Sequence, residues 1–283
     1  MLKRDLALAL QYGLPHRLLS RIMYYLTRSE WRWLKNLLIR RISGHFKVDM
    51  NDALEPDLDA YPSFNAFFTR ALRPNARPIA FGAEFLVSPA DGVVSQAGAI
   101  IAGELLQAKG MQFSVAELLA DSEAAEHFAN GSFATVYLSP RDYHRVHMPC
   151  AARLVKTLHV PGRLFSVAQW TAESIPRLFA RNERLVCLFD SEHGRIAVVF
   201  VGAIFVSSID TVWSGAVTPP YAPKVLSTNI SQPGPRFEAG AEIGRFNMGS
   251  TIVVLSERAF VGAPGAVPGA PVKVGQLLGT FVS

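Results

Sequence analysis

The sequence contains little cysteine and little charge, and it has no long hydrophobic run. Its two cysteines, Cys150 and Cys187, cannot form a disulfide framework and suit a reducing compartment. Only 18% of the 283 residues are charged and 49% are hydrophobic, a composition that excludes a disordered chain. No stretch reaches the ~20 apolar residues of a membrane-spanning helix, and the apolar run at residues 6–10 lacks the cleavage pattern of a signal peptide. We expect a globular protein on the cytosolic side of a membrane.

Positive charge is concentrated at the N-terminus. Residues 1–50 contain ten Lys or Arg and three acidic residues, a net charge of +7, whereas the rest of the chain carries −2. The basic residues alternate with apolar and aromatic ones, among them Tyr24, Tyr25, Trp31 and Trp33. This pattern is typical of amphipathic helices on anionic membranes, and packing on the protein's own core is the alternative. Nucleic-acid binding is not favoured, because the basic residues form no polar stripe.

Hydrophobic spacing predicts helices in the first fifty residues, one behind Pro15 and one from about Glu30 to a stop at Gly44. Short β-rich runs predict strands at residues 133–138, 185–189, 196–206 and 252–255. Helical patches are expected at residues 115–119, extending toward 128, and at 166–180. The pattern G-x-x-[IL]-G-x-F occurs at 240–246 and 275–281 and is similar to turns of lipoyl-like proteins. We predict an α+β fold: a mainly antiparallel β barrel or sandwich over residues 51–283, and a helical membrane-association segment over residues 1–50.

Three short segments combine residues that can carry out chemistry. Residues 88–92 (SPADG) contain Asp91, residues 139–149 contain His144 and His147, and residues 246–252 contain Ser250. Separately, the first and third segments are ordinary turn sequences. Together they contain the members of a charge relay, in which a carboxylate orients an imidazole that deprotonates a hydroxyl. We predict no metal site, because H-x-x-H has no third His or Cys nearby and the local charge is positive.

Longer segments are shared with one protein family. They are residues 64–70 (FNAFFTR), 89–92 (PADG), 106–110 (LQAKG), 137–150 (YLSPRDYHRVHMPC), 178–184 (LFARNER) and 249–251 (GST). With the basic N-terminal helices, they make the chain resemble the bacterial, membrane-associated phosphatidylserine decarboxylases nearly from end to end. One departure is Met248 where the family has leucine, a volume-conserving change beside the reacting pair.

The resemblance implies a proenzyme that cleaves itself between Gly249 and Ser250. Ser250 would attack the carbonyl of Gly249, with His147 as general base held by Asp91. Elimination and loss of ammonia would then convert residue 250 into a pyruvoyl group, the covalent cofactor. The fragments 1–249 (β chain) and 250–283 (α chain) would form a heterodimer, and a higher homo-oligomer is left open.

The resemblance also implies the reaction and its location. The pyruvoyl group would form a Schiff base with phosphatidylserine and accept electrons while carbon dioxide leaves, giving phosphatidylethanolamine. His144 is the candidate that reprotonates the carbanion; a structural contact with Asp142 or Tyr143 is its alternative role. Such a lyase of phospholipid biosynthesis would be a peripheral protein on the cytoplasmic face of the bacterial inner membrane.

Two other functions are alternatives to a decarboxylase. A serine hydrolase could use Asp91, His147 and Ser250, but Ser250 lacks the G-x-S-x-G nucleophile elbow. A non-enzymatic membrane adaptor with a lipoyl-like domain would leave the three residues unexplained. Both alternatives predict an uncleaved chain.

Overall fold

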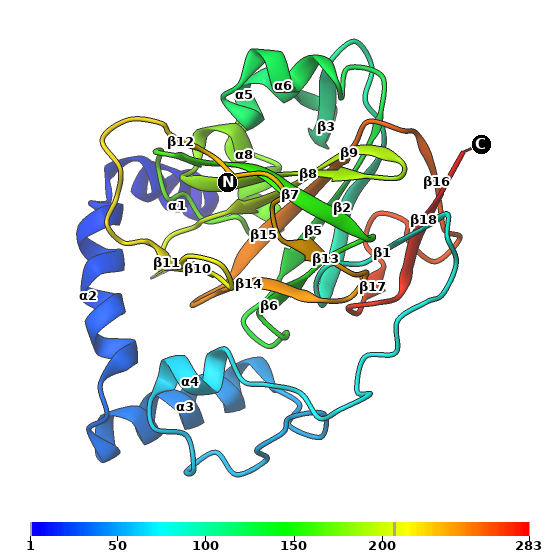
Figure 1. Ribbon diagram of the computed structural model, residues 1–283. Coiled ribbons are helices and arrows are strands. Elements are labelled where there is room, and N and C mark those ends of the chain that lie inside the picture. Colours follow the sequence, from blue (N-terminus) through cyan, green and yellow to red (C-terminus); the bar gives the residue numbers. More distant parts are fainter. Residues whose placement is uncertain (1, 206–207, 283) are drawn as a thin grey trace.

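The computed structural model describes residues 2–205 and 208–282. Helices begin the chain: α1 (Leu2–Gly13), α2 (His16–Arg28), α3 (Arg32–Phe46) and the short α4 (Phe64–Phe68). Helix α2 runs along one side of the molecule, from α1 beside the large sheet to α3 and α4 below it (Figure 1). None of the described helices is long and apolar enough to cross a membrane.

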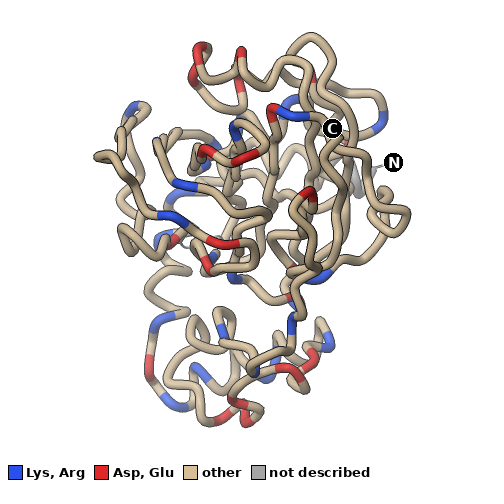
Figure 2. Tube along the Cα trace, turned by 45° about the vertical axis from the view of Figure 1, so that its right-hand side comes forward, with Lys and Arg blue, Asp and Glu red and all other residues tan. Residues whose placement is uncertain are grey.

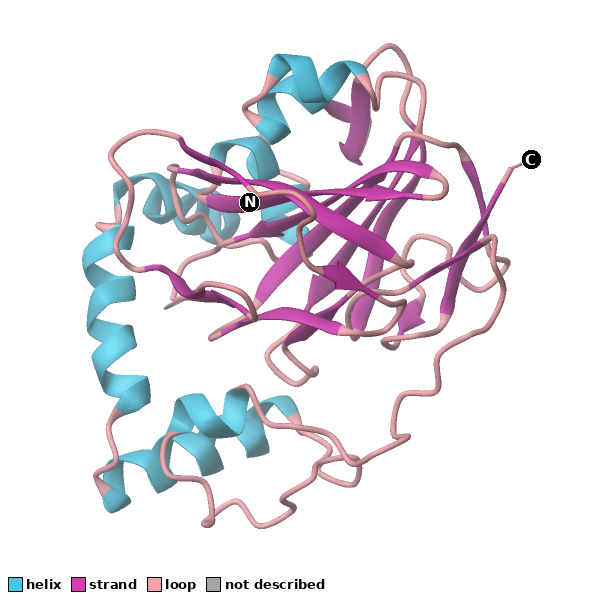
Figure 3. Cartoon of the chain, in the orientation of Figure 1, coloured by secondary structure: helices cyan, strands magenta, loops and turns pink. Residues whose placement is uncertain are grey.

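The largest sheet among the described residues has nine strands, and all its pairs are antiparallel. Its order is β12 (Leu226–Asn229), β7 (Ala152–Val160), β8 (Arg184–Ser191), β9 (Gly194–Val201), β15 (Ser250–Ser256), β5 (Ser132–Leu138), β2 (Gly92–Ala99) and β17 (Pro271–Val272), with β13 (Arg236–Phe237) also on β7. Every residue of β15 is buried, because this strand lies between β9 and β5 in the middle of the sheet. The strands fill the centre of the molecule and the helices lie at its edges (Figure 3).

Smaller sheets flank this one. They are β1 (Phe85–Val87) with β18 (Leu277–Phe281) and β16 (Phe260–Gly262); β11 (Gly215–Thr218) with β10 (Ile209–Thr211), β14 (Glu242–Phe246) and β6 (Arg145–His147); and β3 (Glu104–Ala108) with β4 (Met111–Ser114). The described residues also form the short helices α5 (Val115–Leu119), α6 (Ser122–Glu126), α7 (Gln169–Ala172) and α8 (Leu178–Arg181), the last two separated by residues 173–177. The α+β class, with mainly antiparallel sheets and N-terminal helices, is confirmed.

Three predicted boundaries are wrong. Helix α3 continues past Gly44 and ends at Phe46, followed by the C-cap Lys47, which has a left-handed φ of 53°. The strand expected at 196–206 ends at Val201, and position 206 lies outside the described residues. The helix expected at 166–180 is broken into α7 and α8, because Pro176 cannot continue a helix.

The repeated G-x-x-[IL]-G-x-F pattern forms the same local turn twice. Gly240 and Gly275 have φ values of +80° and +82°, and a Cβ added at either would come within 2.6 Å of Cδ1 of Ile79. Glycine is therefore required at both positions. The strands that follow, β14 and β18, belong to different sheets. The turn thus recurs, whereas a lipoyl-like barrel remains a prediction.

Helix α2 buries polar side chains and exposes large apolar ones, the reverse of the usual arrangement. Its buried residues are the polar His16, Ser20 and Thr27. Large apolar residues of α1 to α3, and Trp31 at the N-cap of α3, are exposed instead: Leu6, Leu10, Tyr12, Leu18, Ile22, Tyr25, Leu26, Trp31, Trp33 and Leu37. Exposed apolar patches of this kind mark interaction surfaces in soluble proteins.

Both signs of charge occur in the lower part of the molecule, which contains α3 and α4 (Figure 2).

A second, smaller core joins α3 to α4. Ile39 of α3 is fully buried with Phe64, Phe67 and Phe68 of α4. Met248 packs against this core and also against the main core of the sheets. Residues on both sides of the boundary predicted at position 50 therefore share one core.

We expect Ile39→Ala to destabilise the protein by about 2–5 kcal/mol, because it removes buried methyl groups and leaves a cavity. Urea unfolding of the purified chain measures this change. Leu37→Ala is the matched control on the same helix, since Leu37 is 58% exposed whereas Ile39 is fully buried. Equal losses for both variants would contradict the second core.

Candidate active site

Ser250 begins the central strand β15, directly after the turn that contains Gly249. Its backbone pairs with Leu138 of β5. Its hydroxyl is fully buried and has no hydrogen-bond partner among the described residues. Most buried hydroxyls are hydrogen-bonded, so an unpartnered one needs an explanation, and a chemical role is one such explanation.

His144 lies beside the bond that precedes Ser250. Its Nδ1 is 2.8 Å from the carbonyl oxygen of Asp142, so Nδ1 carries the proton of the neutral ring and Nε2 is left as an acceptor. Nε2 is buried without a hydrogen-bond partner in the described part of the chain. It lies 3.9 Å from the position that a Cβ on Gly249 would occupy. The ring packs on Phe68 of α4, with centroids 4.1 Å apart.

Burial determines the protonation state of His144. It lowers the pKa of the ring to about 3, since the surroundings cannot solvate an imidazolium, and the charge of Arg70 lowers it further. The backbone carbonyl of Asp142 opposes this shift. His144 is therefore a neutral base at physiological pH, with its free nitrogen toward Gly249.

His147, three residues later on β6, has different partners. Its Nδ1 lies 2.8 Å from the carbonyl oxygen of Gly240, and its Nε2 is 3.0 Å from the hydroxyl of Tyr143. Facing a carbonyl, Nδ1 donates, so Nε2 accepts the tyrosine proton. Burial lowers the pKa of His147 below its ordinary value. The Gly240 carbonyl and the charges of Glu242 and Asp91 offset only part of this shift.

Asp91 is held by an arginine that the sequence did not point to. Arg77 binds both carboxylate oxygens, with Nη2 at 2.6 Å from Oδ2 and Nε at 2.9 Å from Oδ1. The backbone N–H of Val274 donates to Oδ1 at 2.8 Å, and Arg77 also pairs with Asp52 at 2.7 Å. Arg77 lies in a loop fourteen positions before Asp91, and no spacing rule in the sequence connects the two.

The structure thus brings His144 to the Gly249–Ser250 bond and brings Asp91 into the neighbourhood of His147. The backbone N–H of His147 donates to Pro89 at 2.8 Å, which ties β6 to the turn that contains Asp91. No hydrogen bond joins the side chains of Asp91 and His147 within the residues that the structure describes. The expected contact of His144 with Asp142 is present through the backbone oxygen.

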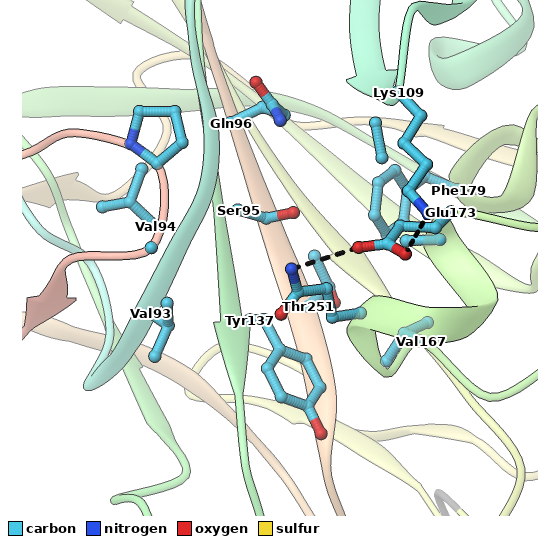
Figure 4. Close-up of a pocket in the computed structure, with 15 residues that line it drawn as sticks. Val93, Val94, Ser95, Gln96, Lys109, Tyr137, Val167, Glu173, Phe179 and Thr251 are labelled. Atoms are coloured by element: carbon cyan, nitrogen blue, oxygen red, sulfur yellow. Dashed lines mark hydrogen bonds and ion pairs between the residues drawn. The ribbon is translucent and has the colours of Figure 1, made fainter.

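A cavity of about 290 Å³ opens on the other side of β15 (Figure 4). Thr251 lines it, and the Thr251 hydroxyl is buried without a hydrogen-bond partner among the described residues. Val93 and Val94 of β2, Val167 and Phe179 supply apolar walls. Within the described residues, no group of three or more His, Cys, Asp or Glu side chains is placed to hold a metal ion.

We expect nuclear magnetic resonance of ¹⁵N-histidine-labelled protein to show His144 neutral, with its proton on Nδ1, at pH 5. The folded chain takes up this proton only near pH 3, and the unfolded chain does so near pH 6.5. His144 therefore lowers the folding stability progressively as the pH falls below 6.5. His144→Gln assigns the resonance and should reduce that acid sensitivity. A His144 resonance that titrates near pH 6.5 would contradict this geometry.

Comparison with known proteins places the chain in a family. A family model described as phosphatidylserine decarboxylase matches residues 64–280, and one described as PSD matches residues 6–47. The phosphatidylserine decarboxylase proenzyme of Alkalilimnicola ehrlichii is 52% identical over 272 residues, which cover 95% of this chain and 94% of that protein. The proenzyme of Ectopseudomonas mendocina is 51% identical over 282 residues (98% and 99%), and that of Methylococcus capsulatus is 50% identical over 279 residues (96% and 95%). The chain belongs to the phosphatidylserine decarboxylase family.

Proposed function

We propose that the chain is a proenzyme that cleaves itself between Gly249 and Ser250, and that the mature enzyme converts phosphatidylserine into phosphatidylethanolamine and carbon dioxide. Family membership over nearly the whole chain supports the activity. The observation that carries the choice of Ser250 is its buried, unpartnered hydroxyl, next to the bond that faces the free Nε2 of His144.

The proposed cleavage proceeds through an acyl shift, an elimination and a hydrolysis. The Ser250 oxygen attacks the carbonyl carbon of Gly249; the peptide C–N bond breaks, an ester forms, and the hydroxyl proton moves to the new amine of residue 250. Loss of the Cα proton and cleavage of the Cβ–O bond release Gly249 as a carboxylate and leave dehydroalanine. Water then replaces ammonia and produces the pyruvoyl ketone. A base beside Ser250 speeds such proton transfers by about 10²–10⁴-fold.

Two histidines are candidates for this base. The family resemblance assigns the role to His147 with Asp91, and in this arrangement His147 must exchange its bond to Tyr143 for one to Ser250. The geometry favours His144, because its unpartnered Nε2 already lies beside Gly249. In the first arrangement His144 handles the proton after decarboxylation; in the second it acts in maturation.

The surroundings of residue 250 fit a pyruvoyl group. Once formed, it would supply an electrophilic carbonyl for the substrate amine and an acceptor for the electrons released with carbon dioxide. Strand β15 would hold it one residue before Thr251, which lines the cavity. Pairing with β9 and β5 keeps the 250–283 fragment in the sheet after the cut, so the two chains stay together.

The exposed helices support a place on the membrane. Trp31 and Trp33 are 67% and 64% exposed, and their rings lie 5.9 Å apart. The exposed Arg17, Arg21 and Arg32 lie on the same helices and can meet anionic headgroups. We place the protein as a peripheral enzyme on the cytoplasmic face of the bacterial inner membrane, where its lipid substrate lies.

The intact mass of the Ser250→Ala variant tests the proposed self-cleavage. Ser250→Ala should remain a single chain, because it lacks both the nucleophile and the pyruvoyl precursor, whereas the unsubstituted chain yields 1–249 and 250–283. Cleavage of Ser250→Ala at the same bond would overturn the proposal, and an uncleaved wild type would favour a serine hydrolase.

His144→Ala and His147→Ala, compared in the same assay, identify the base. Loss of cleavage only in His147→Ala assigns the base to His147 and leaves His144 for turnover. Loss only in His144→Ala assigns it to His144. Normal maturation of both variants would remove the histidines from the scheme.

We expect the double substitution Trp31→Ser, Trp33→Ser to weaken binding to anionic vesicles at least tenfold, since burying one large apolar side chain contributes about 1.5–3 kcal/mol. Sedimentation with vesicles at increasing salt measures this, and wild-type binding should weaken as exposed charges are screened. Phe81→Ser is the control, because Phe81 is 96% exposed but outside the helices. These point substitutions leave Ile39 and the core between α3 and α4 in place, which deletion of the helices would not. Undiminished vesicle binding would contradict the proposal that Trp31 and Trp33 contact the membrane.

A further inference from the structure

The segment LQAKG at residues 106–110 has no part in the chemistry above, yet it builds one wall of the cavity. Gln107 is fully buried, and its amide makes three hydrogen bonds. Its Nε2 donates to the carbonyls of Ala172 (2.7 Å) and Ile175 (2.8 Å), and its Oε1 accepts from the N–H of Leu178 (2.8 Å). Gln107 therefore fixes the break between α7 and α8 against strand β3.

Lys109 lies at the turn between β3 and β4, next to the segment that Gln107 fixes. Its φ is 49°, an unfavourable value for a side chain with a Cβ, and Gly110 follows with φ 78°. Nζ of Lys109 is 2.8 Å from Oε2 of Glu173, and Oε1 of Glu173 accepts from Gln169 at 3.2 Å. Figure 4 shows the contact between Lys109 and Glu173 beside the cavity. A strained backbone that holds a cation at a cavity suits a functional residue.

The same cavity extends to residue 251. Lys109, Gln169 and Glu173 line it together with Thr251, whose buried hydroxyl has no hydrogen-bond partner among the described residues. Lys109 is the one Lys or Arg among the described residues that line the cavity. The rest of the wall is largely apolar: Val93, Val94, Ala108, Val167, Ala172, Phe179 and Pro268.

We propose that Lys109 binds the phosphate of the phosphatidylserine headgroup, and that Glu173 and Gln169 position its ammonium. This inference rests on the proposed function, since it takes the cavity beside residue 250 as the substrate site. The headgroup carries two anions, a phosphodiester and a carboxylate. The phosphodiester keeps its charge throughout the reaction, whereas the carboxylate leaves as neutral carbon dioxide.

That difference assigns the cation to the phosphate. A lysine bound to the carboxylate would stabilise the starting charge and oppose its loss, whereas an apolar wall favours loss of the charge. A lysine bound to the phosphate contributes equally before and after carbon dioxide leaves. Lys109 should therefore affect substrate binding more than the chemical step.

Steady-state kinetics with short-chain phosphatidylserine below its micelle concentration tests this without a membrane surface. A hydrogen bond to a charged group is worth about 1.5–3 kcal/mol, so Lys109→Ala should raise KM about tenfold or more with little change in kcat. Lys109→Arg should retain most of the affinity. Lys156→Ala is the matched control, because it also breaks an ion pair (with Asp121, 2.6 Å), outside the cavity lining.

A binding measurement separates this inference from the maturation scheme. In the uncleaved Ser250→Ala chain, glycerophosphoserine should bind more tightly than L-serine, which lacks the phosphate, and Lys109→Ala should remove that preference. An unchanged preference, or an unchanged KM, would overturn the role of Lys109. The intact mass of Lys109→Ala should show two fragments, because Lys109 has no role in the proposed self-cleavage. If the self-cleavage proposal is wrong, the wild-type chain will stay uncleaved, whereas the binding comparison in Ser250→Ala does not depend on cleavage.

Discussion

The pairing of β15 with β9 and β5 is the constraint on which the site depends. Seven residues of β15 pair with β5 and six with β9, so the backbone at residue 250 has little freedom. The bond proposed to be cut, between Gly249 and Ser250, is the one by which the chain enters this strand. A hydroxyl at this position is fixed in direction and kept from water, and both conditions favour attack on the preceding carbonyl over hydrolysis. The same pairing would hold the proposed 250–283 fragment in the sheet after the cut.

The N-terminal helices are in contact with the elements that form the candidate site. Helix α3 packs on α4, the ring of Phe68 of α4 contacts that of His144, and Met248 packs against both cores. At the end of α2, Arg28 donates to the Ser208 hydroxyl at 2.8 Å, and Ser208 bonds Asn247, three residues before Ser250. The turn before Ser250 is therefore supported by contacts from the N-terminal helices.

Local features could be predicted from the sequence, and long-range contacts could not. Strands at 133–138 and 252–255 are present because their β-branched and aromatic runs fit a buried sheet. The break between α7 and α8 follows from Pro176, a local signal that hydrophobic spacing alone overlooked. The pairing of Arg77 with Asp91 and that of Tyr143 with His147 depend on how loops meet in space, and no periodicity in the sequence encodes this.

The alternation of side chains along β15 separates two tasks. Ser250 and Thr251 are consecutive in a strand, so their side chains point to opposite faces of the sheet. Ser250 follows Gly249, which lies beside Nε2 of His144, whereas Thr251 lines the cavity together with Lys109. While the chain is intact, the peptide to Gly249 and the strand ladder together hold residue 250. After the proposed cleavage, residue 250 would be held by Thr251, which lines the cavity, and by its pairing with Leu138. The proposed cut would therefore create the reactive group one residue away from the cavity.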